Sequence, residues 1–98
     1  MPLRSNAEDL SSIFHALGHP DRLKLIGELQ ESEKDVQTLQ HALGVPQARV
    51  SQHLAVLRSH HMVQERREGR HVFYSLTQAA MADWLVEGLA VLEQILIL

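Results

Sequence analysis

The chain has 98 residues, of which 45% are hydrophobic, a formal net charge of −3 and no cysteine. This length suits one small domain spanning 1–98, and without cysteine there is no disulfide, no thiolate metal ligand and no cysteine nucleophile. No segment approaches the ~20 apolar residues of a membrane-spanning helix, and the first residues contain no continuous apolar signal region, so we expect a cytoplasmic protein without membrane contact.

Two helices are predicted in the first third of the chain. The first should begin near Ser5 or Asn6, because either side chain can cap a helix, and should end at Gly18. Pro20 suits the first turn of the second helix, where its missing N–H costs no hydrogen bond. Apolar residues recur at helical spacing in both segments, and the polar run 30–34 is predicted to be an exit loop.

The next two helices are predicted to form a helix-turn-helix at about 35–60. Asp35 can cap the first of them, which should stop at Gly44. After a brief turn, the second should run from about Gln47 to His60, with its apolar residues on one face and its polar side chains on the other. Two short helices joined by a tight turn that contains glycine are typical of this arrangement.

A β-hairpin and a long helix are predicted to complete the chain. The segments 62–67 and 71–76 are rich in Val, Phe and Tyr, and Glu68-Gly69-Arg70 lies between them as a turn, so 62–76 should form the hairpin. From about 78 to 97 apolar residues recur at steps of three and four. This last helix is too apolar to be left exposed, and a partner subunit would help so small a chain to bury apolar surface.

Charge is segregated along the sequence. The segment 46–76 carries five basic and two acidic residues, whereas the remainder carries four basic and ten acidic ones. The positive charge therefore gathers on the helix-turn-helix and hairpin although the chain as a whole is acidic.

Three stretches resemble the ArsR/SmtB family of bacterial winged-helix repressors. They are HALGHPDRLKLIGEL at 15–29, LGVPQARVSQHLAVLR at 43–58 and VQERREGRHVFYSL at 63–76. The resemblance implies a mostly α fold with a small β-hairpin, in the order α-α-α-α-β-β-α, and a transcriptional repressor. It also implies a homodimer that binds a palindromic double-stranded DNA operator, with half-sites one helical turn apart.

In such a dimer the first and last helices pack across the two-fold axis. The side chains expected at the interface are all apolar: Leu10, Phe14, Trp84, Leu85, Leu89, Leu92, Ile95 and Leu96.

The DNA contacts implied by the resemblance lie on the second helix of the helix-turn-helix and on the hairpin, or wing. The recognition-helix candidates are Gln47, Arg49, Ser51, Gln52 and His53. Gln suits adenine and Arg suits guanine because their donors and acceptors match these base edges in pairs. Ser51 and Gln52 are alternatives for phosphate contacts, and His53, beside a core leucine, is as readily a packed residue.

The wing candidates are basic residues expected along the DNA backbone or in the minor groove: Arg66, Arg67 and Arg70. A solvated hairpin of mixed charge is the alternative. Arg58, near the end of the recognition helix, is expected to stabilise the dipole of that helix.

Members of this family often sense metals through cysteines near the third helix or through histidines and carboxylates on the last one. This chain has neither set, because it lacks cysteine and has no histidine after His71. We therefore expect no metal and no cofactor, with the effector unknown. A composite site that uses His15, His19 or His41, which would make a histidine-based metal-responsive repressor, stays an alternative.

The residues also bear on two other function classes, enzymes and protein-binding modules. No phosphate-binding loop, nucleophile motif or metalloenzyme spacing is present, so we do not expect an enzyme. A winged-helix module that binds other proteins is the stronger rival, but arginines and glutamines at positions expected to face a DNA groove argue against it.

Overall fold

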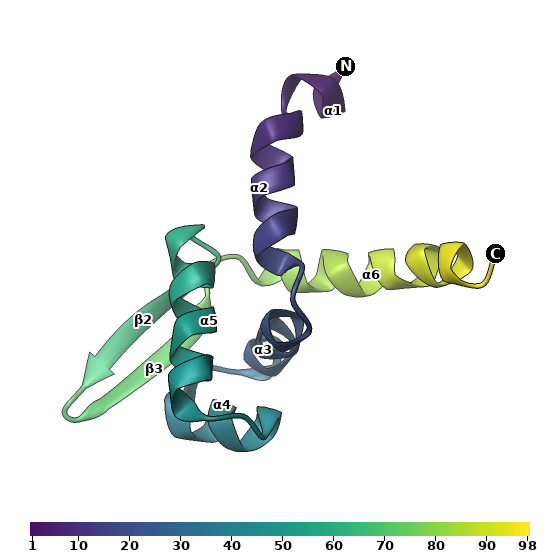
Figure 1. Ribbon diagram of the computed structural model, residues 1–98. Helices are drawn as coiled ribbons and strands as arrows, with labels where there is room; N and C mark the ends of the chain where they lie inside the picture. Colours follow the sequence, from purple (N-terminus) through teal and green to yellow (C-terminus); the bar gives the residue numbers. More distant parts are fainter.

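The computed structural model describes residues 1–98, which form six helices and a three-stranded sheet (Figure 1). In chain order the elements are α1 (Pro2–Ser5), α2 (Ala7–Leu17), α3 (Pro20–Glu31), β1 (Lys34–Asp35), α4 (Val36–Leu43), α5 (Gln47–Ser59), β2 (Val63–Glu68), β3 (His71–Leu76) and α6 (Ala79–Leu96). The prediction of a mostly α fold with a winged helix-turn-helix is confirmed, and no helix has the length and apolar character needed to cross a membrane.

The helix-turn-helix follows the predicted chemistry closely. The Asp35 side chain accepts a hydrogen bond of 2.8 Å from the Thr38 amide and so caps α4. Gly44 ends α4 in the left-handed conformation, with φ of 67°, which glycine adopts without steric cost. The predicted limits of the two helices, the wing and the last helix differ from the observed ones by one or two residues.

Two short elements were not predicted. The chain begins with α1, and the side chains of Ser5 and Asn6 donate to the carbonyls of Met1 and Pro2. The first long helix therefore begins where predicted, with Asn6 as its N-cap residue, but neither side chain caps it because both hydrogen-bond backward into α1. The two residues of β1 pair with β3, so the wing hairpin extends into a sheet of order β1-β3-β2.

The core lies around α3, which contacts α2, α4, α5, α6 and β3. The large side chains that are fully buried come from four elements: Leu25, Ile26, Leu39, Val50, Leu54, Leu57 and Val63. Three of these side chains come from α5, so the inner face of this helix packs tightly in the core. This packing fixes the direction in which the outer face of α5 points.

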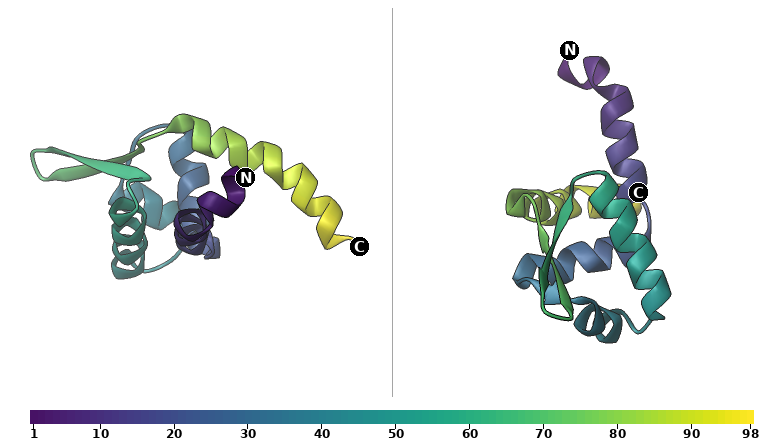
Figure 2. Two further views of the ribbon diagram at one scale, coloured as in Figure 1. Left: turned by 90° about the horizontal axis from the view of Figure 1, so that it is seen from above. Right: turned by 90° about the vertical axis from the view of Figure 1, so that its left-hand side faces the viewer.

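Two parts of the chain extend beyond this core. The N-terminal end, with α1 and the start of α2, projects away from the body, and so does the C-terminal part of α6 (Figures 1 and 2). The wing projects on the side opposite to the end of α6 (Figure 2). The helices predicted to meet a partner subunit are thus the ones that reach furthest from the core, α6 on the side opposite to the wing and α2 in a separate direction (Figure 1).

Candidate nucleic-acid interface

The first turns of α5 present a row of polar side chains to solvent. Gln47, Arg49, Ser51 and Gln52 are all exposed, whereas Val50 on the opposite side is completely buried. Pro46 precedes the helix and gives no side-chain cap, so the amides of Gln47 and Ala48 lie free at the positive end of its dipole, whereas that of Arg49 donates to the Pro46 carbonyl. This helix end can therefore receive base edges or phosphate oxygens.

The wing projects from the body, and its turn shares one surface hollow with the start of α5 (Figure 1). Glu68 and His71 pair across a two-residue turn in which Gly69 has a φ of 60°, a geometry that favours glycine at the first turn position. Gln47 from α5 and Arg70 from the turn line the same surface groove, together with Asp35 and His71. Side chains from the start of the recognition helix and from the turn of the wing therefore border the same hollow.

The arginines of this surface differ in whether they have a partner within the protein. Arg49, Arg67 and Arg70 are exposed and take part in no salt bridge. In contrast, Arg58 pairs with Glu65 across 2.8 Å, and the guanidinium of Arg66 pairs with two carboxylates. The free positive charge therefore gathers at the start of α5 and along the wing.

His53 does not belong to this exposed surface, and of its two predicted roles the structure shows the packed one. Its side chain is buried, with 8% of the residue accessible, because it lies three residues after Val50 and four before Leu57 and thus on the inner face of α5. Its Nε2 lies 3.5 Å from an Asp21 carboxylate oxygen, and its Nδ1 accepts from the Arg22 guanidinium at 3.3 Å. His53 therefore links the recognition helix α5 to the start of α3 through its contacts with Asp21 and Arg22.

This contact also creates the one group of residues whose ligand atoms could approach a metal ion. Atoms of His19, Asp21 and His53 lie within 4.8 Å of one another, and His15 and His41 are not part of the group. However, Nδ1 of His19 accepts from the Asp21 amide at 3.0 Å, and Nδ1 of His53 accepts from Arg22. Each neutral ring therefore carries its proton on Nε2, and a fixed cation lies beside one of them, so the arrangement does not fit a metal.

His53 should make folding stability depend on pH. Burial lowers its pKa below the ordinary 6.5, the charges of His19 and Arg22 lower it further, and Asp21 opposes them. Since the unfolded chain then binds the proton more readily, the stability is present above about pH 6.5 and is lost as the pH falls toward the lower folded pKa. We expect the urea midpoint to fall less steeply on acidification in His53→Gln than in the unmodified protein.

Urea titrations at about pH 8, 6.5 and 5.5 measure this difference. Because the histidines that do not contact His53 are common to both proteins, their titration cancels in the comparison, and the remaining difference reports His53 together with its neighbour His19. Parallel pH dependences in the two proteins would show that His53 is not the responsible group.

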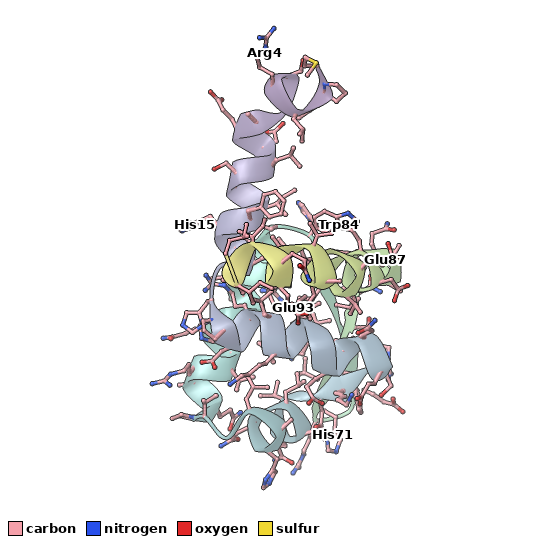
Figure 3. The ribbon with its side chains drawn as sticks, turned by 90° about the vertical axis from the view of Figure 1, so that its right-hand side faces the viewer. Arg4, His15, His71, Trp84, Glu87 and Glu93 are labelled. Atoms are coloured by element: carbon pink, nitrogen blue, oxygen red, sulfur yellow. The ribbon has the colours of Figure 1, made fainter.

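An apolar surface lies on the other side of the molecule, along α2 and α6. The rings of Phe14 and Trp84 are 6.2 Å apart, and Trp84 lies on the side of α6 near α2 (Figure 3). Among the predicted interface residues, Leu10 and Leu85 are half-buried within the chain itself. The other six residues have exposed fractions between 49% and 81%: Phe14, Trp84, Leu89, Leu92, Ile95 and Leu96. Large apolar side chains grouped in this way indicate a protein-interaction surface.

Comparison with known proteins places relatives of this chain among bacterial regulators. A family model described as "Bacterial regulatory protein, arsR family" matches residues 19–65, which include α3, the helix-turn-helix and the start of the wing. The biofilm growth-associated repressor of Xylella fastidiosa is 36% identical over 81 residues, covering 83% of this chain and 71% of that protein. The HTH-type transcriptional repressor SmtB of Mycobacterium tuberculosis is 35% identical over 89 residues, covering 91% and 66%.

Solved structures agree with these sequence matches. The crystal structure of the transcriptional repressor BigR from Xylella fastidiosa superposes with a TM-score of 0.83 at 32% identity, and the match covers 92% of each chain. The reduced form of HlyU from Vibrio cholerae gives a TM-score of 0.78 at 31% identity, covering 86% of this chain and 92% of that one.

Proposed function

Because the chain belongs to the ArsR family of bacterial regulatory proteins, we propose that two copies of it bind a palindromic DNA operator and repress transcription. In this proposal the exposed side chains at the start of α5 contact base edges in the major groove, and Arg67 and Arg70 of the wing contact phosphates. The role is regulatory rather than enzymatic, and it is exercised at DNA in the bacterial cytoplasm.

The arginines without internal partners carry this proposal. In a chain of net charge −3, a DNA-binding surface must gather its positive charge locally. Arg49, Arg67 and Arg70 meet this condition, since none of them is neutralised by a carboxylate of the protein. A protein-binding winged helix would have no need to keep three guanidinium groups of the recognition helix and wing free of carboxylate partners.

The apolar surface on α2 and α6 supports the homodimer. The end of α6 projects on the side opposite to the wing, and the start of α2 projects away from the wing tip as well as from α4, so a second copy joined through these helices would leave both recognition helices free (Figures 1 and 2). Two recognition helices related by a two-fold axis match a palindrome whose half-site centres are about 10 base pairs apart.

Selection from a library of random DNA duplexes tests the proposal. We expect the bound duplexes to share an inverted repeat with this spacing, and insertion of about half a helical turn between the half-sites should abolish tight binding. Recovery of sequences without a shared repeat would contradict the proposed operator recognition.

A further inference from the structure

Arg66 differs from the other two wing arginines, Arg67 and Arg70, because its guanidinium has partners within the protein. Its Nη2 and Nε donate to the two carboxylate oxygens of Glu33 at 2.6 and 3.2 Å, and its Nη1 donates to Glu68 at 2.7 Å. The centre of the guanidinium also lies 4.8 Å from the centre of the Phe73 ring, on the adjacent strand. The charge of Arg66 is therefore shared between two carboxylates and an aromatic face.

The two faces of β2 explain why Arg66 and Arg67 behave differently. Glu65 pairs with Arg58 of α5, so the face of the strand that bears Glu65 is directed toward the recognition helix. Side chains alternate along a strand, which puts Arg67 on the same face as Glu65 and Arg66 on the opposite one. A phosphate contact by Arg66 would have to come from the far side of the wing and would break the pair with Glu33.

Glu33 belongs to the body of the domain rather than to the wing. It lies between the end of α3 and the start of β1. The residue after it, Lys34, is the first of β1 and pairs with Tyr74 of β3. The hydrogen bond from Arg66 lowers the pKa of Glu33, so the carboxylate stays charged well below neutral pH. A side-on guanidinium–carboxylate pair fixes direction as well as distance, since both groups are planar.

We propose that Arg66 is a positioning residue which clamps the wing to Glu33 of the domain body, with Glu68 as a second partner, and that it contacts no phosphate. The clamp holds Arg67 and Arg70 at the angle at which they reach the DNA backbone. This inference rests on the proposed DNA-binding function, but the clamp itself is a property of the free protein.

The substitution Glu33→Gln separates a clamp from a DNA contact because the two predict opposite signs. The variant loses one negative charge, which by electrostatics alone should strengthen binding to DNA, and it would release Arg66 for a phosphate. The clamp instead predicts operator binding weaker by roughly threefold to tenfold, a range suited to one exposed but well-aligned ion pair. Tighter binding by Glu33→Gln would overturn the proposal.

Glu31→Gln is the matched control. It removes the same charge two residues away, from a carboxylate that contacts Lys34 and not the wing. We expect operator binding by this variant to be equal to that of the unmodified protein or slightly tighter.

Arg66→Gln gives a second readout through the dependence of affinity on salt. A clamp leaves the slope of log affinity against log salt unchanged, whereas loss of a phosphate contact reduces it by about 1. The double variant with Glu33→Gln should bind no more weakly than Arg66→Gln alone, since Arg66→Gln already breaks the pair with Glu33. A reduced slope, or additive losses, would assign Arg66 to the DNA interface.

Amide hydrogen exchange in the absence of DNA separates this inference from the proposed function. In Glu33→Gln the amides of β2 and β3 should exchange faster than in Glu31→Gln, whether or not the protein binds an operator. If the unmodified protein bound no DNA, the proposed function would fail while the exchange result still decided the clamp. Unchanged exchange in the wing would overturn the clamp.

Discussion

Replacing Ile95 with glutamate is expected to turn the dimer into monomers and to weaken operator binding by about a hundredfold or more. In the single chain Ile95 is 59% exposed and lies on the α6 segment that extends beyond the core. Burial of such a side chain contributes about 1.5–3 kcal/mol, and a two-fold interface contains it twice. The expected loss of about 3–6 kcal/mol corresponds to at least a hundredfold change in the dimer dissociation constant.

Ala90→Glu is the control for this substitution. Ala90 is exposed and lies three residues after Glu87 and four before Gln94, on the polar side of α6, so the added charge should leave the dimer intact. Sedimentation velocity at micromolar protein, followed by operator titration, measures both effects. A stable dimer of Ile95→Glu would refute the assignment of the end of α6 to the interface.

Replacing Arg49 with alanine is expected to change which DNA sequence the protein prefers. Arg49 is exposed in the first turn of α5 and has no partner in the protein, and arginine pairs with guanine through two hydrogen bonds. The loss on the preferred operator should be about 1–3 kcal/mol, roughly fivefold to 150-fold. Operators with that guanine replaced should lose almost nothing.

Two other arginines give the comparison for Arg49→Ala. Arg67→Ala should weaken binding to all sequences alike and reduce the salt slope by about 1, because a phosphate contact carries no sequence information. Arg4→Ala, at the far end of the molecule from the wing, should change neither quantity (Figure 3). If Arg49→Ala weakened binding equally on every sequence, Arg49 would be a phosphate contact.

The architecture was predictable because local signals and long-range packing agree. The Asp35 cap, the Gly44 stop and the turn at Gly69 each require a particular residue type at a particular place, and all three appear in the structure as predicted. The strand β1 escaped prediction because two residues carry no periodic pattern, and the pairing with β3 that creates it joins segments far apart in the sequence.

The roles of individual side chains in the candidate site were less predictable where those side chains contact residues of other helices or strands. The spacing of His53 from Val50 and Leu57 is a sufficient signal for burial, and it decides between the two roles that its residue type leaves open. For Arg66 the strand alternation indicates a face different from that of Arg67, yet its partner Glu33 lies 33 residues away. Charge patterns along the sequence therefore locate the basic surface but do not show which arginines are neutralised within the fold.

The most direct test of the account is a binding titration with the metal-free protein on the selected operator and on a scrambled duplex of equal length and composition. At about 0.15 M salt the account predicts that the operator binds at least about a thousandfold more tightly than the scrambled duplex, with one dimer on each operator and no dependence on added zinc. Equal affinity for the two duplexes would contradict the central claim that this surface recognises a DNA sequence.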